Sequence, residues 1–283
     1  MLASLLVVAT GLAVLAWLLA VPWVTGRRRR RLESTPLDTR WREPVERNVA
    51  LVRRLPHDQR TRLDGLINAF VAQKQFVGCN GLVVTDEMRA TIAAHACTLL
   101  LGRPRSHYAA LREILVYPTP FWVDEDIHDD DGLVTRRRHV LSGQSWDSSR
   151  IIVSWQDVLE TVRWPGTGYN VVLHEFAHYF DAEAEPCAGP VRPGTRESFE
   201  APARETRGWR AALTEEFERV ADAVDDGVET FLDPYAAEDE AEFFAVATED
   251  FVERSAELEA HEPRVYALLE AYYGIDPARW SST

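Results

Sequence analysis

A histidine, a glutamate and a second histidine stand in this sequence at the spacing of a zinc site. Residues 171–178 read VVLHEFAH, which contains the pattern HExxH at His174, Glu175 and His178. On a helix, residues four apart lie one turn apart on the same face, so both imidazoles can bind one metal ion. Glu175, beside the first histidine, can act as general base on a zinc-bound water. These residues predict a hydrolytic site with one zinc ion.

A catalytic zinc site also needs a third protein ligand, and the chain offers carboxylates for it. No third histidine follows at the short spacing of metzincins. A later acidic segment contains five suitable side chains, those of Glu238, Asp239, Glu240, Glu242 and Glu249. Small or apolar residues surround Glu242, which places it near the core, where a carboxylate needs a partner. Asp181, three residues after His178, is a candidate for fixing the tautomer of a ligand histidine.

A mainly helical α+β domain with a small sheet is predicted to position these residues. Apolar spacing predicts helices near residues 45–74, 86–101, 170–181, 209–224, 238–254 and 262–273. Short segments rich in β-branched and aromatic residues predict strands at residues 114–117, 121–123, 139–141 and 151–155. The acidic stretch 124–132 and the Pro- and Gly-containing stretch 182–208 are predicted loops. The strand at 151–155 is a candidate edge for pairing with an extended substrate.

The N-terminal segment differs sharply from the rest of the chain. Residues 1–26 contain no charged side chain, and residues 27–31 are five arginines. A helix of about 20 apolar residues spans a bilayer, and arginines favour the cytoplasmic side. A cleaved signal peptide is the alternative, but its basic residues would precede the apolar run. We predict a transmembrane anchor at 1–26, a basic juxtamembrane linker at 27–44, and a catalytic domain at 45–283 on the cytoplasmic side of the inner (cytoplasmic) membrane.

The charge of the remaining chain excludes one class of function. Five of the 31 Lys and Arg lie in the arginine run, while all 45 Asp and Glu follow it, so residues 32–283 have a formal charge of −19. Such an acidic body argues against direct nucleic-acid binding through phosphate contacts. The hydrophobic content of 46% argues against a disordered chain. Three unpatterned cysteines suit a reducing compartment.

Five segments of the chain form a pattern that extends beyond HExxH. Their sequences are FVGCNGLVVTDEMR at 76–89, IAAHACTLLL at 92–101, VLSGQSW at 140–146, NVVLHEFAH at 170–178 and AEFFAV at 241–246. Together they resemble the Mlc titration factor A (MtfA) family of zinc-dependent peptidases. They occur in the family's order and cover roughly residues 45–275. The N-terminal segment lies outside the resemblance.

The resemblance implies a zincin-like fold, distantly similar to the catalytic domain of anthrax lethal factor. It implies zinc held by His174, His178 and Glu242, the gluzincin arrangement, with Glu175 as base in peptide hydrolysis. Lethal factor has a tyrosine seven residues before its third ligand, and Tyr235 stands at that offset here, where it could stabilise an oxyanion. The resemblance also implies an alternative function, the sequestration of an Mlc-like transcriptional repressor that controls sugar uptake. The expected partners are a peptide or protein substrate and, in the alternative, that repressor.

Overall fold

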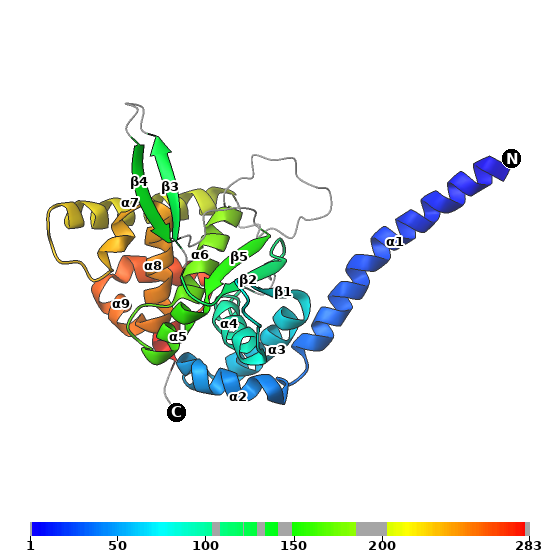
Figure 1. The fold of residues 1–283 in the computed structure, drawn as a ribbon, viewed down its shortest axis with the longest axis horizontal. Coiled ribbons are helices and arrows are strands. Elements are labelled where there is room, and N and C mark those ends of the chain that lie inside the picture. The colour runs from blue at the N-terminus through cyan, green and yellow to red at the C-terminus, as the bar shows by residue number, and fades with distance from the viewer. Residues whose placement is uncertain are drawn as a thin grey trace.

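The computed structural model describes residues 2–103, 108–120, 122–128, 134–140, 149–184 and 203–280. Figure 1 shows a body of helices with a small sheet, from which one long N-terminal helix projects. The predicted mainly helical α+β class with a small sheet is confirmed. Two predicted features, most of the VLSGQSW segment and most of the loop after the second histidine, fall on residues 141–148 and 185–202, outside the described chain.

The projecting helix α1 (Leu2–Glu33) runs without interruption through the five arginines. Its last turn lies against α3 (His57–Gln73) at Gly65, where an added Cβ would be 2.0 Å from the Glu33 carbonyl oxygen. Asn68 holds the chain just beyond it by donating to the carbonyl oxygens of Thr35, at 2.8 Å, and Pro36. None of the helices in the described residues is both long and apolar enough to cross a membrane. The structure therefore gives no support to the transmembrane helix predicted at 1–26.

The helix predicted over residues 45–74 is divided in the structure. A helix α2 (Thr39–Asn48) is followed by a 3-10 turn η1 (Ala50–Arg53) and then by α3. Pro56 is the N-cap of α3; it has no N–H and fixes its own φ, so a helix starts after it more readily than it passes through it. The next helix, α4 (Asp86–Thr98), begins as predicted, with the Thr85 hydroxyl accepting from the Met88 N–H.

Three short strands form a parallel sheet in the order β1-β2-β5. They are β1 (Gln75–Gly78), β2 (Glu113–Tyr117) and β5 (Arg150–Ser154). Parallel pairing requires a crossover connection, and α4 supplies it between β1 and β2. The sequence prediction missed β1 because four residues give too short a pattern to show alternation. In the described sheet β5 lies at an edge, with β2 as its neighbour.

A separate antiparallel hairpin projects beside the sheet (Figure 1). It consists of β3 (Trp122–His128) and β4 (Val134–Val140). The loop prediction for residues 124–132 is therefore wrong for Asp124–His128. In the strand register Asp124, Glu125 and Asp126 stand opposite three arginines, residues 136–138. The pairing joins two segments of the chain, so it is hidden when each segment is judged alone.

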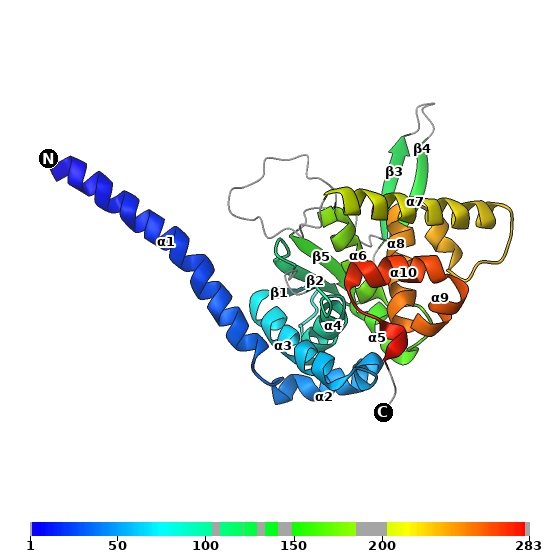
Figure 2. The same cartoon turned by 180° about the vertical axis from the view of Figure 1, so that it is seen from behind.

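The second half of the chain is helical and carries the predicted site. Its elements are α5 (Trp155–Arg163), α6 (Val171–Ala184), α7 (Ala203–Asp225), η2 (Pro234–Ala237), α8 (Glu240–Glu253), α9 (Ser255–His261), α10 (Pro263–Tyr273) and η3 (Pro277–Arg279). Helices α6 and α8 pack against each other, and α7 and α10 both contact α8 (Figure 2). Rings of Phe176, Phe180 and Phe244 are fully buried around this contact. Burial of such rings contributes the largest apolar areas and fixes the two helices together.

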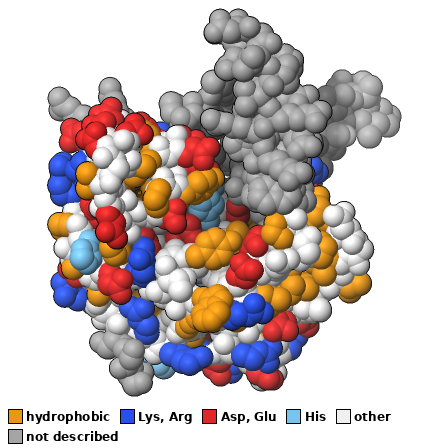
Figure 3. All heavy atoms as spheres, turned by 60° about the vertical axis from the view of Figure 1, so that its left-hand side comes forward, with side chains coloured by type: hydrophobic (Ala, Val, Ile, Leu, Met, Phe, Trp, Pro, Cys, Tyr) orange, Lys and Arg blue, Asp and Glu red, His pale blue; other side chains and the backbone are white. Residues whose placement is uncertain are grey.

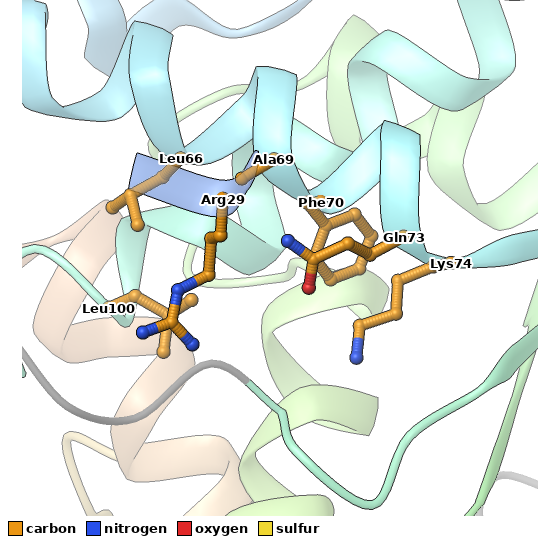
Figure 4. Close-up of a pocket in the computed structure, with 7 residues that line it drawn as sticks. All are labelled: Arg29, Leu66, Ala69, Phe70, Gln73, Lys74 and Leu100. Atoms are coloured by element: carbon orange, nitrogen blue, oxygen red, sulfur yellow. The ribbon is translucent and has the colours of Figure 1, made fainter. Parts of the chain in front are cut away.

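A small cavity lies where α1 meets the body (Figure 4). Its lining consists of Arg29 from α1 and of Leu66, Ala69, Phe70, Gln73, Lys74 and Leu100. The space of about 10 Å³ is enough for one water molecule. None of the predicted site residues lines this cavity.

Candidate metal centre

Helix α6 presents the two histidines of HExxH from a firmly held position. Its N-cap is Asn170, whose side-chain oxygen accepts from the Leu173 N–H at 3.1 Å. Apolar residues on its other faces are buried, and they include Leu173 and Phe176. As the four-residue spacing predicts, the rings of His174 and His178 lie close together, with their Nε2 atoms 3.1 Å apart. Two ring nitrogens thus face the same small space.

Glu242 at the start of α8 completes the group. Its Oε2 lies 3.1 Å from Nε2 of His174 and 3.5 Å from Nε2 of His178. Within the described residues, these three side chains form a set whose ligand atoms all lie within 4.8 Å of one another. The Glu242 Oε2 atom is buried but has no hydrogen-bond partner of suitable geometry. Two imidazole nitrogens and a carboxylate oxygen that converge on one small space fit a tetrahedral metal ion.

Three other carboxylates have different surroundings: Glu238 and Asp239, considered as third ligands, and Asp181, considered as a support for a ligand histidine. Asp239 is the N-cap of α8 and accepts from the N–H groups of Ala241 and Glu242 at 2.8 Å. Glu238 is exposed on the turn before the helix. Asp181 accepts from Arg210 of α7 at 2.8 Å. Of these three residues, Asp239 therefore stabilises the helix that carries Glu242 and Asp181 pairs with an arginine.

Glu249 takes the supporting role for which Asp181 was considered. Its Oε1 lies 2.8 Å from Nδ1 of His174, while its other oxygen accepts from the backbone N–H of Asn170. A carboxylate on the outer nitrogen fixes the tautomer and direction of a ligand imidazole. The sequence does contain a signal for this role, because Glu249 follows Glu242 by seven residues, two helical turns, and so lies on the same face.

The carboxylates at the site differ in their tendency to ionise. Burial raises the pKa of Glu175 to about 7, although the two histidines act in the opposite direction. Burial also raises the pKa of Glu242, but His174 and His178 outweigh it and hold that pKa well below its usual value. Glu242 is therefore negatively charged, as a metal ligand must be. A carboxyl titrating near neutral pH suits the exchange of a proton with water.

The structure also places Tyr235 at the site. This residue lies in η2 and its ring stacks on that of His174, with 6.2 Å between centroids. Burial, followed by the charge of Glu242, raises its pKa, so the hydroxyl keeps its proton. The side chain is nevertheless 43% exposed. Tyr235 thus offers an O–H donor beside the converging ligand atoms from the solvent side.

A hollow on the surface exposes histidine side chains, with acidic and hydrophobic groups around them (Figure 3). His178 and Glu242 keep side-chain exposures of 14% and 13%, while Glu175 is 3% exposed as a whole residue. A metal at this place would be reachable from solvent with its base still shielded. The arrangement combines three converging side chains that could hold a metal ion, a buried carboxyl group and an accessible O–H donor.

Comparison with known proteins agrees with this geometry. Residues 23–274 match the family model described as glucose-regulated metallo-peptidase M90. The chain belongs to this family. The M90 match covers the sheet, α6 and α8, and therefore every element of the candidate metal centre.

Individual relatives cover most of the chain as well. Mlc titration factor A of Yersinia enterocolitica is 33% identical over 253 residues, which cover 86% of this chain and 89% of that protein. Mlc titration factor A of Yersinia pestis is 32% identical over 249 residues, 86% of this chain and 88% of its own. An uncharacterized protein of Synechocystis, slr2042, is 33% identical over 279 residues and covers 98% of both chains. The resemblance to the MtfA family is thus confirmed.

Proposed function

We propose that this M90 family member is a zinc-dependent peptidase of the gluzincin type. The observation that carries the proposal is the convergence of His174, His178 and Glu242 within 4.8 Å. The family description, a metallo-peptidase, supports the same reaction class. Zinc is the metal that best suits two imidazoles and one carboxylate with an open fourth position.

His174, His178 and Glu242 would hold the zinc ion in the proposed reaction. The bound metal would lower the pKa of its water towards about 7 and polarise the scissile carbonyl. Glu175 takes a proton from the attacking water at its carboxylate and later returns it to the leaving amine. Glu249 keeps the His174 imidazole in its binding orientation throughout. Tyr235 donates its O–H to the oxygen that becomes negatively charged as the peptide carbon turns tetrahedral.

Metal removal tests the reaction class. Purified full-length chain should contain one zinc per molecule and cleave members of a peptide library. Dialysis against EDTA should abolish both properties, and added zinc should restore them. Cleavage that persists in the metal-free chain would contradict the proposal.

Tyr235→Phe tests the oxyanion donor separately from metal binding. Loss of one such donor typically costs 10²–10³-fold in kcat, and we expect a fall of about 100-fold here. Zinc content should stay at the native level because the ring and its stacking on His174 are kept. If Tyr235 serves only packing, kcat will instead stay within about twofold of the native value.

Repressor sequestration is the second candidate function, and the name of the Yersinia relatives, Mlc titration factor A, favours it. In this function the chain would bind an Mlc-like repressor and release it from DNA, with hydrolysis secondary or absent. A pulldown with the full chain separates the two functions. Stoichiometric capture of a transcriptional repressor by a chain without zinc-dependent cleavage would favour sequestration.

An edge strand and a cellular location complete the prediction. We propose that an extended substrate pairs with β5, which is an edge of the described sheet and contacts α6. The location at the inner membrane, with the catalytic domain in the cytoplasm, stays a prediction from the uncharged and arginine-rich segments at residues 1–31.

A further inference from the structure

Asn170 is the N-cap of α6 and contacts two other helices, α4 and α8. Its side chain is fully buried. The amide nitrogen donates to Oε1 of Glu253 at 2.7 Å and lies 3.0 Å from Nδ1 of His95. The amide oxygen accepts from the Leu173 N–H. Both N–H bonds of the amide donate and its oxygen accepts. These partners therefore fix which side of the amide carries the nitrogen and which carries the oxygen.

In this contact His95 of α4 accepts the hydrogen bond and the Asn170 amide donates it. Burial lowers the pKa of His95 to about 4, so the ring is neutral at ordinary pH. A neutral ring with Nδ1 facing the Asn170 amide N–H must carry its proton on Nε2. The contact therefore joins α4 to the N-cap of α6 without introducing a charge.

The loop that leads into Asn170 lies tightly on the second half of α8. The N–H of Gly166 donates to Oε2 of Glu253 at 3.0 Å. Gly168 has φ +91°, and an added Cβ would lie 2.3 Å from Oδ1 of Asp250. Both Glu253 oxygens are thus bound by this loop, one through Gly166 and the other through Asn170. The close approach leaves the loop little room to slide along α8.

This docking reaches the metal centre through Glu249. One Glu249 oxygen accepts from the Asn170 backbone N–H, and the other lies 2.8 Å from Nδ1 of His174. A shift of Asn170 would therefore move the carboxylate that orients the first histidine. The same face of α8 carries Glu242 two helical turns earlier, so the register between α6 and α8 sets the spacing of all three ligand atoms.

We propose that Asn170 is a positioning residue that locks α6 onto α8 and thereby holds Glu249 and His174 in the geometry for metal binding. The inference rests on the proposed zinc peptidase function. An ordinary helix cap would not need asparagine, because serine and aspartate cap equally well. Only an amide side chain has both an oxygen that accepts from the helix N–H and two N–H bonds that donate to Glu253 and His95.

Asn170→Ser tests the contacts of Asn170 with Glu253 and His95 separately from its capping of α6. Serine keeps an oxygen for the Leu173 N–H but cannot reach Glu253 and His95 together. The matched control is Asn68→Ser, since Asn68 is also buried and its amide nitrogen donates to two carbonyl oxygens away from the site. Zinc affinity is measured for both variants and the native chain by competition with a chelator of known affinity, and folding by circular dichroism.

Groups that hold a metal ligand in place typically contribute 10–100-fold to affinity, so we expect Asn170→Ser to lose zinc affinity by about tenfold or more. Asn68→Ser should lose thermal stability but keep native zinc affinity. A folded Asn170→Ser chain with native zinc affinity would overturn the positioning role of Asn170 and leave the proposed peptidase function intact. A native chain that binds no zinc would overturn the proposed function as well.

Glu253→Gln provides a second variant should Asn170→Ser fail to fold. The new amide would turn a donor towards either Gly166 N–H or the Asn170 amide, and one of the two bonds would be lost. Zinc affinity should again fall, by a smaller factor than in Asn170→Ser. An unchanged zinc affinity in folded Glu253→Gln would also contradict the proposed positioning role of Asn170.

Discussion

Glu175→Gln is expected to remove peptide hydrolysis and leave zinc binding intact. Glutamine has the shape of glutamate, so it should fit the site where Glu175 is 3% exposed. It cannot accept the proton of the attacking water. General bases contribute about 10²–10⁴-fold, and we expect kcat/KM to fall within or beyond this range. The measurements are peptide cleavage rate and zinc content of the same preparation.

A control substitution makes the result specific. Glu218→Gln changes charge in the same way on the exposed side of α7 and should keep native activity. Full activity of Glu175→Gln would remove Glu175 from the reaction. Loss of zinc together with activity would instead make Glu175 a structural part of the metal site, contrary to the assignment as base.

The predictable part of the site is the part encoded by local spacing. HExxH defines a helix face within one turn, so the approach of His174 to His178 follows from helix geometry alone. Glu242 lies far along the chain, and the residues by themselves left five carboxylates open. Its burial among apolar neighbours and the family resemblance favoured it, and the structure brings its Oε2 to the two histidines.

Contacts between distant segments account for what the sequence did not reveal. The parallel sheet depends on β1, a strand of four residues that is defined by its pairing with β2 rather than by its own pattern. Asp181 stood at a suitable spacing for His178, but Arg210 of α7 engages it. The seven-residue spacing from Glu242 puts Glu249 on the same face of α8, but its contact with His174 depends on the packing of α8 on α6, which neither helix specifies alone.

Glu242→Ala tests the third ligand and should have the largest effect on metal binding. The substitution removes the only carboxylate oxygen in the described residues that converges with both histidine nitrogens. Losing a direct ligand should cost more than losing a group that merely orients one, and the latter costs about 10–100-fold. We therefore expect zinc affinity to fall by more than about 100-fold, with hydrolysis lost in parallel. Metal analysis after gel filtration and chelator competition measure the change.

Two further substitutions on α8 allow the loss of zinc affinity to be compared between carboxylates of the same helix. Glu249→Ala removes the partner of the His174 Nδ1 atom but no ligand atom, so zinc affinity should fall by about 10–100-fold. Glu240→Ala removes a carboxylate in the first turn of α8 that is not part of the converging set, and zinc affinity should stay native. Zinc affinity should therefore fall most in Glu242→Ala, less in Glu249→Ala and not at all in Glu240→Ala. Glu242 supplies a converging ligand atom, Glu249 holds a ligand histidine, and Glu240 does neither. If Glu240→Ala lost zinc while Glu242→Ala kept it, the assignment of Glu242 as third ligand would be wrong. If Glu249→Ala and Glu242→Ala lost zinc affinity equally, Glu249 would be as essential to zinc binding as a ligand.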